Sequence, residues 1–88
     1  MVLNMKYYCP CCGYFVYDYK AAAKFGICPI CYWENDPVQK ADINLEGGAN
    51  ELSLKKARDN YKNIGASDAK YLDRVRAPKP TEKKADIC

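Results

Sequence analysis

The chain has 88 residues, with 14 basic and 11 acidic side chains and a formal net charge of +3 at pH 7. A chain this short forms one domain whose hydrophobic core alone is marginal, so a metal, disulfides or a partner commonly supplements it. It contains six cysteines and no histidine, which excludes Ser-His-Asp and Cys-His catalysis and every mixed Cys/His metal site. The mild charge falls well short of the dense basic surface of a dedicated nucleic-acid binder.

The sequence shows no export or membrane signal. Its first residues carry no basic stretch followed by an apolar run, and no segment approaches the roughly 20 apolar residues of a membrane span. We therefore expect a cytoplasmic protein that has no membrane partner. Disulfides are disfavoured in that compartment, so paired cysteines indicate metal ligands or redox centres.

The order of the sequence patterns predicts an α+β fold, in which a small zinc-ribbon-like β unit precedes two short α-helices. We expect a single domain over residues 1–78, with the ribbon at about 5–36, a loop at 37–52 and helices at about 53–77. Residues 79–88 are polar and interrupted by proline, which predicts a flexible tail.

Short strands are expected around the first cysteines. Residues 6–8 lead into these cysteines and residues 14–17 follow them, and both runs are rich in β-forming side chains. Residues 21–24, Ala-Ala-Ala-Lys, predict a turn or a short helical piece before the second group of cysteines.

Two helices are expected in the C-terminal half. Ser53 is a suitable N-cap and Gly65 a suitable C-terminal glycine for the first helix. Between them, one apolar stripe recurs at helical spacing: Leu54, Ala57, Tyr61 and Ile64. Ser67 is expected to cap the second helix, which presents Leu72 on its apolar face and stops at Pro78.

The cysteine spacing is the strongest signal in the sequence. Cys9-x₂-Cys12 and Cys28-x₂-Cys31 are separated by fifteen residues, a spacing typical of zinc sites. Two such turns facing each other supply four thiolates in the tetrahedron that a closed structural Zn²⁺ site prefers. Gly13 follows the first pair and permits the positive φ that such a turn requires, whereas the second pair is followed by Tyr32.

Other interpretations of the cysteines stay open at this stage. Cys11 could replace Cys9 or Cys12 as a ligand, although the choice of Cys9 and Cys12 matches the second pair. The same four sulfurs also suit a rubredoxin-like iron site, and a dithiol redox pair or a disulfide framework is a further alternative. A fully ligated site leaves no position for water and argues against metal catalysis, so we expect no enzyme.

Aromatic residues crowd the cysteine pairs and suggest a surface for a partner. The expected partner-binding residues are Tyr14, Tyr17, Tyr32 and Trp33, since tyrosine and tryptophan are enriched in protein interfaces. The alternative is that these rings wall the metal site and form a thin core under the helices.

Basic residues in the helical region support a second hypothesis, a zinc ribbon that binds nucleic acid. Six of them fall on the two expected helices: Lys55, Arg58, Lys62, Lys70, Arg74 and Arg76. Four thiolates with one Zn²⁺ carry a combined charge of −2, which lowers the formal +3 to +1 and weakens this hypothesis.

The linked order of motifs resembles the cysteine-rich CPCC family of small bacterial proteins. The matching features are CPCCG at 9–13, ICPICYWENDPVQ at 27–39, GGANELSLKKARDNYKNIGAS at 47–67 and YLDRVRAP at 71–78. The resemblance implies zinc binding by the cysteines of the two turns, and it brings no established reaction.

The function that these observations favour is a non-enzymatic protein-binding module stabilised by one structural Zn²⁺. Its narrower form, suggested by the resemblance alone, is an immunity or antitoxin-like protein that binds a bacterial toxin. Nucleic-acid binding is the alternative, and a redox or iron protein is the third hypothesis.

Overall fold

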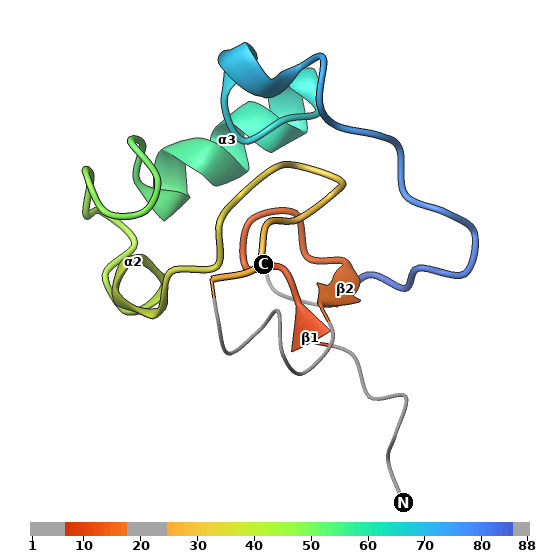
Figure 1. Cartoon of the computed structure of the whole chain (residues 1–88), viewed down its shortest axis with the longest axis horizontal. Coiled ribbons are helices and arrows are strands. Elements are labelled where there is room, and N and C mark those ends of the chain that lie inside the picture. The colour runs from red at the N-terminus through yellow and green to blue at the C-terminus, as the bar shows by residue number, and fades with distance from the viewer. Residues whose placement is uncertain (1–6, 18–24, 86–88) are drawn as a thin grey trace, which may run out of the picture.

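Two strands and two helices surround a pair of cysteine-containing turns in the computed structural model, which describes residues 7–17 and 25–85 (Figure 1). The architecture is broadly α+β, as predicted. The piece expected at residues 21–24 and the last residues of the tail lie outside the described residues. In chain order the elements are β1 (Tyr7–Tyr8), β2 (Phe15–Tyr17), α2 (Pro37–Ala41), α3 (Leu54–Ile64) and a 3₁₀ turn (Ala69–Tyr71).

The two strands form on either side of the first cysteine turn, where the sequence predicts them. They pair antiparallel, with Tyr7 opposite Tyr17 and Tyr8 opposite Phe15. The Tyr8 and Phe15 rings meet edge to face with centroids 5.8 Å apart, an arrangement that aromatic quadrupoles favour. Cys9 extends the pairing by donating its N–H across the hairpin at 2.9 Å. The hairpin therefore closes directly around the first cysteine turn.

Helix α3 begins and ends where its capping residues predict. The hydroxyl of Ser53 accepts the N–H of the residue three positions later at 3.2 Å, and Gly65 adopts a left-handed conformation with φ of 81°. Leu54 and Ala57 of the apolar stripe are fully buried. Tyr61 is half-buried and packs against the core cluster, whereas Ile64 at the end of the stripe is 42% exposed, so the last turn of the helix leaves the core.

The second predicted helix is wrong in its extent: it is reduced to the 3₁₀ turn Ala69–Tyr71. Asp68, and not Ser67, caps this turn through its side chain. The N–H of Ser67 instead donates to the carbonyl of Cys31 at 2.8 Å. This long-range bond attaches the chain to the second cysteine turn in place of a helix start. Leu72, which was expected on the apolar face of the second helix, is 50% exposed.

The predicted loop at residues 37–52 is wrong at its start, because helix α2 forms there. The carboxylate of Asp36 accepts the N–H groups of Val38 and Gln39 at 2.8 and 3.4 Å, and Pro37 occupies the first helical position. An aspartate N-cap followed by proline is a recognised start signal. The helix has only five residues, too short for a periodic pattern to reveal it.

Part of the predicted tail at residues 79–88 is instead paired with the hairpin. The carbonyl of Lys83 accepts the N–H of Phe15 at 2.9 Å, and the N–H of Ala85 donates to the carbonyl of Gly13 at 2.6 Å. After residue 78 the chain thus returns to the first cysteine turn. No local sequence pattern predicts this pairing.

A buried amide network fixes the segment between α2 and α3. Gln39 is fully buried, and its Nε2 donates to the carbonyl oxygens of Leu45, Asn50 and Leu52 at 3.0 to 3.1 Å. Its Oε1 accepts both the backbone N–H and the side-chain amide of Asn50 at 3.0 Å. The side chain of Asn50 also exchanges two hydrogen bonds of 2.9 Å with the backbone of Glu34.

Asp36 holds the same segment from the other side. While one carboxylate oxygen caps α2, the other accepts the N–H of Ala49 at 2.9 Å. Hydrogen bonds from the backbone of Ala49, and also from Val38 and Gln39, lower the pKa of Asp36 below its ordinary value against the opposing effect of burial. A Cβ at Gly48 would lie 2.7 Å from this second oxygen, so the close approach requires glycine.

We expect Gln39→Leu to destabilise the metal-loaded protein by about 2–4 kcal/mol, because three carbonyl groups and Asn50 lose their buried partner. Urea unfolding measures the change. Lys40→Arg, at an exposed position of the same helix, keeps a cation over the Tyr8 ring; it is the control and should shift stability by no more than about 0.5 kcal/mol. Equal effects of the two substitutions would contradict a stabilising role for this network.

Candidate metal centre

The first cysteine turn folds back on its own leading residue. The N–H of Cys11 points at the sulfur of Cys9 at 3.4 Å, and the N–H of Gly13 donates to the carbonyl of Cys9 at 2.8 Å. Gly13 has φ of 86°, the left-handed conformation that its position predicts. The turn thus brings the sulfurs of Cys9 and Cys12 to the same side.

The second cysteine turn repeats this geometry without a glycine. Ile30 donates its N–H to the sulfur of Cys28 at 3.4 Å, and Tyr32 donates its N–H to the Cys28 carbonyl at 2.8 Å. Tyr32 itself has φ of 70°, a conformation that costs about 1 kcal/mol or more for a residue with a side chain. Its ring is held between Tyr71, with centroids 4.6 Å apart, and the guanidinium of Arg74 at 5.9 Å.

The four predicted ligand sulfurs come together in the interior. Cys9 lies 3.5 Å from Cys31 and Cys12 lies 3.6 Å from Cys28, sulfur to sulfur, and all four sulfurs lie within 4.8 Å of one another. A disulfide would need about 2.05 Å. Four sulfurs at about 2.3 Å from a central ion are about 3.8 Å apart. The set therefore fits a tetrahedral metal site, and all four cysteines are buried.

The sulfurs cannot all carry a negative charge without a cation. Burial raises the pKa of the Cys9 thiol, but hydrogen bonds from Cys12, Cys28 and Cys31 outweigh it and lower that pKa. The pKa of Cys12 is raised, chiefly by its hydrogen bond with Cys28. The pKa of Cys31 is raised as well, chiefly by its hydrogen bond with Cys11. One thiolate therefore keeps its neighbours protonated, and a bound metal ion would let all four ionise.

The sequence itself matches the cysteine-rich CPCC family over residues 7–82. The chain belongs to this family. The matched residues include both cysteine turns and both helices, so all four clustered cysteines lie within the part of the chain that the family model covers. No curated protein matches the sequence. Within the part of this CPCC protein that the structure describes, no helix is long and apolar enough to cross a membrane.

The fifth buried cysteine, Cys11 of the CPCC motif, neighbours Cys31 but does not belong to the group of four sulfurs. Cys11 is 5% exposed and is not among the four sulfurs that meet. Its side chain lines a hollow on the surface next to α3. The structure therefore favours Cys9 and Cys12 as the ligands from the first turn.

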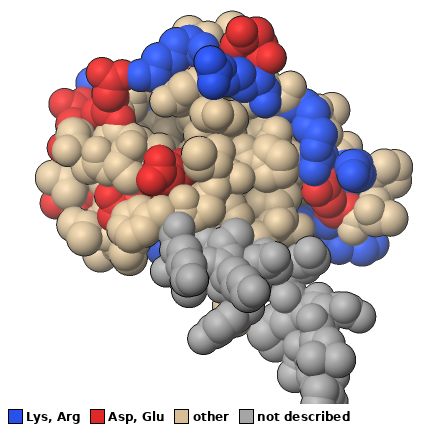
Figure 2. Space-filling view, viewed as in Figure 1, with Lys and Arg blue, Asp and Glu red and all other residues tan. Residues whose placement is uncertain are grey.

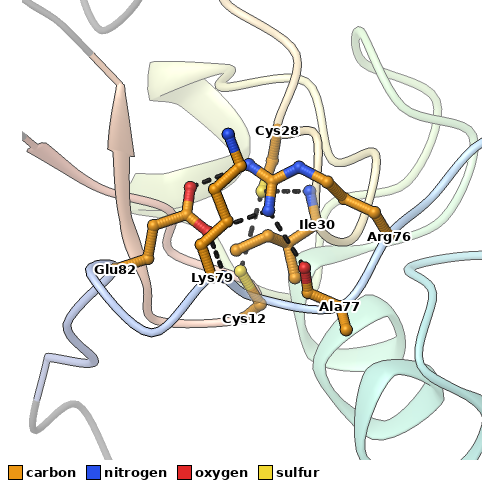
Figure 3. A network of polar contacts seen from close by, with 7 residues as sticks. All are labelled: Cys12, Cys28, Ile30, Arg76, Ala77, Lys79 and Glu82. Atoms are coloured by element: carbon orange, nitrogen blue, oxygen red, sulfur yellow. Dashed lines mark hydrogen bonds and ion pairs between the residues drawn. The ribbon is translucent and has the colours of Figure 1, made fainter.

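An ion pair that sequence reasoning missed covers the cluster. Arg76 forms two parallel hydrogen bonds of 2.8 Å with the carboxylate of Glu82, and its N–H donates to the carbonyl of Pro29 at 3.2 Å. Figure 3 shows the pair beside Cys12 and Cys28. Glu82 raises the pKa of Arg76, and negative charge on Cys28 raises it further. With a metal bound by four thiolates, the guanidinium end of this pair would face the negative charge of the site.

The structure corrects two of the four predicted partner-binding residues. Tyr17 and Trp33 are each 1% exposed, and the hydroxyl of Tyr17 donates to the carbonyl of Trp33 at 3.0 Å. Both rings pack against the cysteine turns as core, which is the alternative considered for them. Tyr14 and Tyr32 are half-buried.

Two of the six basic residues considered for nucleic acid are already paired with carboxylates. Lys70 pairs with Glu51, and Arg76 with Glu82. Figure 2 shows Lys and Arg side chains along the upper edge of one face, over the segment that follows α3, and acidic side chains over the loops beside α2. Three of the six lie on α3 itself, namely Lys55, Arg58 and Lys62.

Cys12→Ser should reduce the affinity for Zn²⁺ by more than about 100-fold, because it removes a ligand from a set of four. Cys11→Ser is the matched control and should bind one ion per chain, as the unmodified protein does. Metal content after dialysis against a competing chelator measures both. Retention of metal by Cys12→Ser together with its loss by Cys11→Ser would show that Cys11 is the ligand.

The Arg76–Glu82 pair predicts a pH dependence. Arg76, by its hydrogen bonds, lowers the pKa of Glu82 from 4.5 to about 2. Because the folded-state pKa is the lower one, the ionised carboxylate stabilises the fold above about pH 4.5, and this stability is lost as the pH falls towards 2. Glu82→Gln should be less stable than the unmodified protein by about 1 kcal/mol at neutral pH.

The difference between the two proteins should shrink below about pH 4.5, because Glu82 then takes up a proton, first in the unfolded chain, whereas the glutamine of the variant does not titrate. Urea midpoints across this pH range measure it. Glu51→Gln removes an exposed partner of Lys70 and serves as control, with little expected change. A difference that does not depend on pH would contradict the role assigned to Glu82.

Proposed function

We propose that this CPCC protein is a non-enzymatic binding module whose fold depends on one structural Zn²⁺ ion. The observation that carries the proposal is the set of four buried cysteine sulfurs within 4.8 Å of one another. A tetrahedral ion held by four protein ligands keeps no position for water or substrate. When bound, the ion would supply cross-linking and charge neutralisation.

The composition of the core supports a structural role for the ion. Among the described residues, five of the eleven buried hydrophobic residues are cysteines. Without a metal, nearly half of these buried positions hold small thiols in place of large apolar side chains, and less apolar surface remains to offset the entropy of folding. Zinc binding and folding should therefore be coupled.

Zinc is proposed over iron because closed four-cysteine sites are the usual structural setting of Zn²⁺. The donor set alone also suits iron. The N–H groups of Cys11 and Ile30 directed at sulfur fit either ion. Colour separates the two, since oxidised iron bound by four thiolates is red and the zinc site is colourless.

A protein is the partner that we propose for this module. Its surface carries exposed apolar side chains beside the second cysteine turn, with Phe25 44% and Ile27 46% exposed, and such residues suit a protein contact. The narrower hypothesis, an immunity or antitoxin-like protein, rests on the family resemblance alone, and a toxin found as partner would support it.

Native mass spectrometry on untagged protein from its own cells tests both parts of the proposal. We expect one zinc ion per chain together with a protein adduct. Removal of the ion by a strong chelator should abolish the folded circular dichroism spectrum, and added Zn²⁺ should restore it. Iron in the spectrum, or an unchanged fold without metal, would contradict the structural-zinc proposal, and zinc-loaded protein without any partner would contradict the binding role.

A further inference from the structure

A hollow of about 230 Å³ lies beside the first cysteine turn. Its walls come from three separate parts of the chain, namely this turn, helix α3 and the returning C-terminal segment. Hydrogen bonds fix these parts together: the Nε of Arg58 donates to the carbonyl of Pro10 at 2.8 Å, and Ala85 donates to the carbonyl of Gly13 at 2.6 Å. The hollow is therefore a built feature of the fold and depends on the folded cysteine turn.

Positive charge gathers around this hollow. Its lining holds four basic residues, Lys55, Arg58, Lys62 and Lys84, against one acidic residue, Asp59. The three on α3 are spaced three and four residues apart and therefore share one helix face. Lys84 lies on the returning segment, so the cations approach from two elements.

These cations are not neutralised by carboxylates of the described chain. Among residues 7–17 and 25–85, the ion pairs use Lys56, Lys70 and Arg76 as their basic partners, and none of these lines the hollow. Like charges held close together repel one another, and an anion bound among them relieves that repulsion.

Arg58 is prepared for such an anion. Its Nε is occupied by the carbonyl of Pro10, which fixes the plane of the guanidinium. Within the described part of the chain, its two terminal nitrogens have no hydrogen-bond acceptor. A planar fork held in this way suits two-point contact with phosphate oxygens, a geometry that a lysine does not offer.

We propose that the hollow binds a phosphate group carried by a small organic molecule of about nucleoside monophosphate size. Phosphate offers three terminal oxygens and up to two negative charges, so it can meet cations from both elements, whereas a carboxylate has two oxygens and one charge. The ring of Tyr61 and the side chain of Ala85 in the lining leave an apolar wall for the organic part.

The size of the hollow agrees with this class of ligand. Drug-sized molecules occupy pockets of about 300–1,000 Å³, so a hollow of about 230 Å³ suits a smaller ligand or the phosphate-bearing end of a larger one. A free nucleotide and a nucleic-acid strand present the same phosphate chemistry, and the experiment below separates them. The proposal requires the folded, metal-loaded chain but not the protein partner proposed above.

Isothermal titration calorimetry at low salt tests the proposal on the full, metal-loaded chain. The probes are adenosine monophosphate, inorganic phosphate, a single-stranded oligonucleotide and, at equal ionic strength, glutamate. Lys62→Gln combined with Lys84→Gln removes two exposed cations of the hollow and should weaken binding of adenosine monophosphate by at least about tenfold. Lys56→Gln is the control, because it removes one positive charge from α3 outside the hollow, and it should change the affinity by no more than about twofold.

Tighter binding of adenosine monophosphate than of inorganic phosphate supports the proposal and assigns a free nucleotide. Tighter binding of the oligonucleotide, with an affinity that falls steeply as salt rises, supports it and assigns a nucleic-acid strand. The absence of saturable binding by any phosphate probe overturns it, as does equal binding of glutamate or an equal loss in Lys56→Gln. Circular dichroism and metal content of each variant show that the fold is intact, so failure here is separate from failure of the zinc proposal.

Discussion

The two cysteine turns are the feature on which the rest of this structure depends, because their backbone carbonyl groups anchor the other segments. Helix α3 is attached through Arg58 to the carbonyl of Pro10, and the chain after α3 is attached through Ser67 to Cys31 and through Arg76 to Pro29. The returning segment is attached to Gly13. A metal ion that holds the two turns together would therefore also hold the helix and the C-terminal segment, which is why we expect metal binding and folding to be one event.

A second, metal-independent constraint joins two motifs that are distant in the sequence. Two side chains connect the segment after the second cysteine turn with the Gly-Gly-Ala-Asn segment before α3: the amide of Gln39 accepts hydrogen bonds from Asn50, and the carboxylate of Asp36 accepts the N–H of Ala49. This connection gives a physical reason for the linked order of motifs in this CPCC-family chain: Gly48 must lack a Cβ for the carboxylate of Asp36 to approach. The carboxylate of Asp36 thus has a structural role at both of its oxygens.

The charges of the chain serve different purposes in different places. The Arg76–Glu82 pair lies beside the sulfur cluster (Figure 3), where the guanidinium is already paired with a carboxylate of the chain. Lys70 is paired with Glu51 on the surface. The basic residues around the hollow next to α3 have no such carboxylate partner among the described residues, and this difference singles out the hollow as a place for an external anion. The overall charge of +3 gives no indication of this separation.

The sequence by itself determined the features that local chemistry specifies. These are the cysteine spacing, the hairpin around the first turn, and helix α3 between Ser53 and Gly65, since each depends on residues close together in the chain. Tertiary structure alone decided the burial of Trp33, the loss of the second predicted helix and the return of the C-terminal segment. In each of these cases a backbone group bonds to a residue far away in sequence, as Ser67 does to Cys31, and such a bond overrides local propensity without leaving a pattern in the sequence.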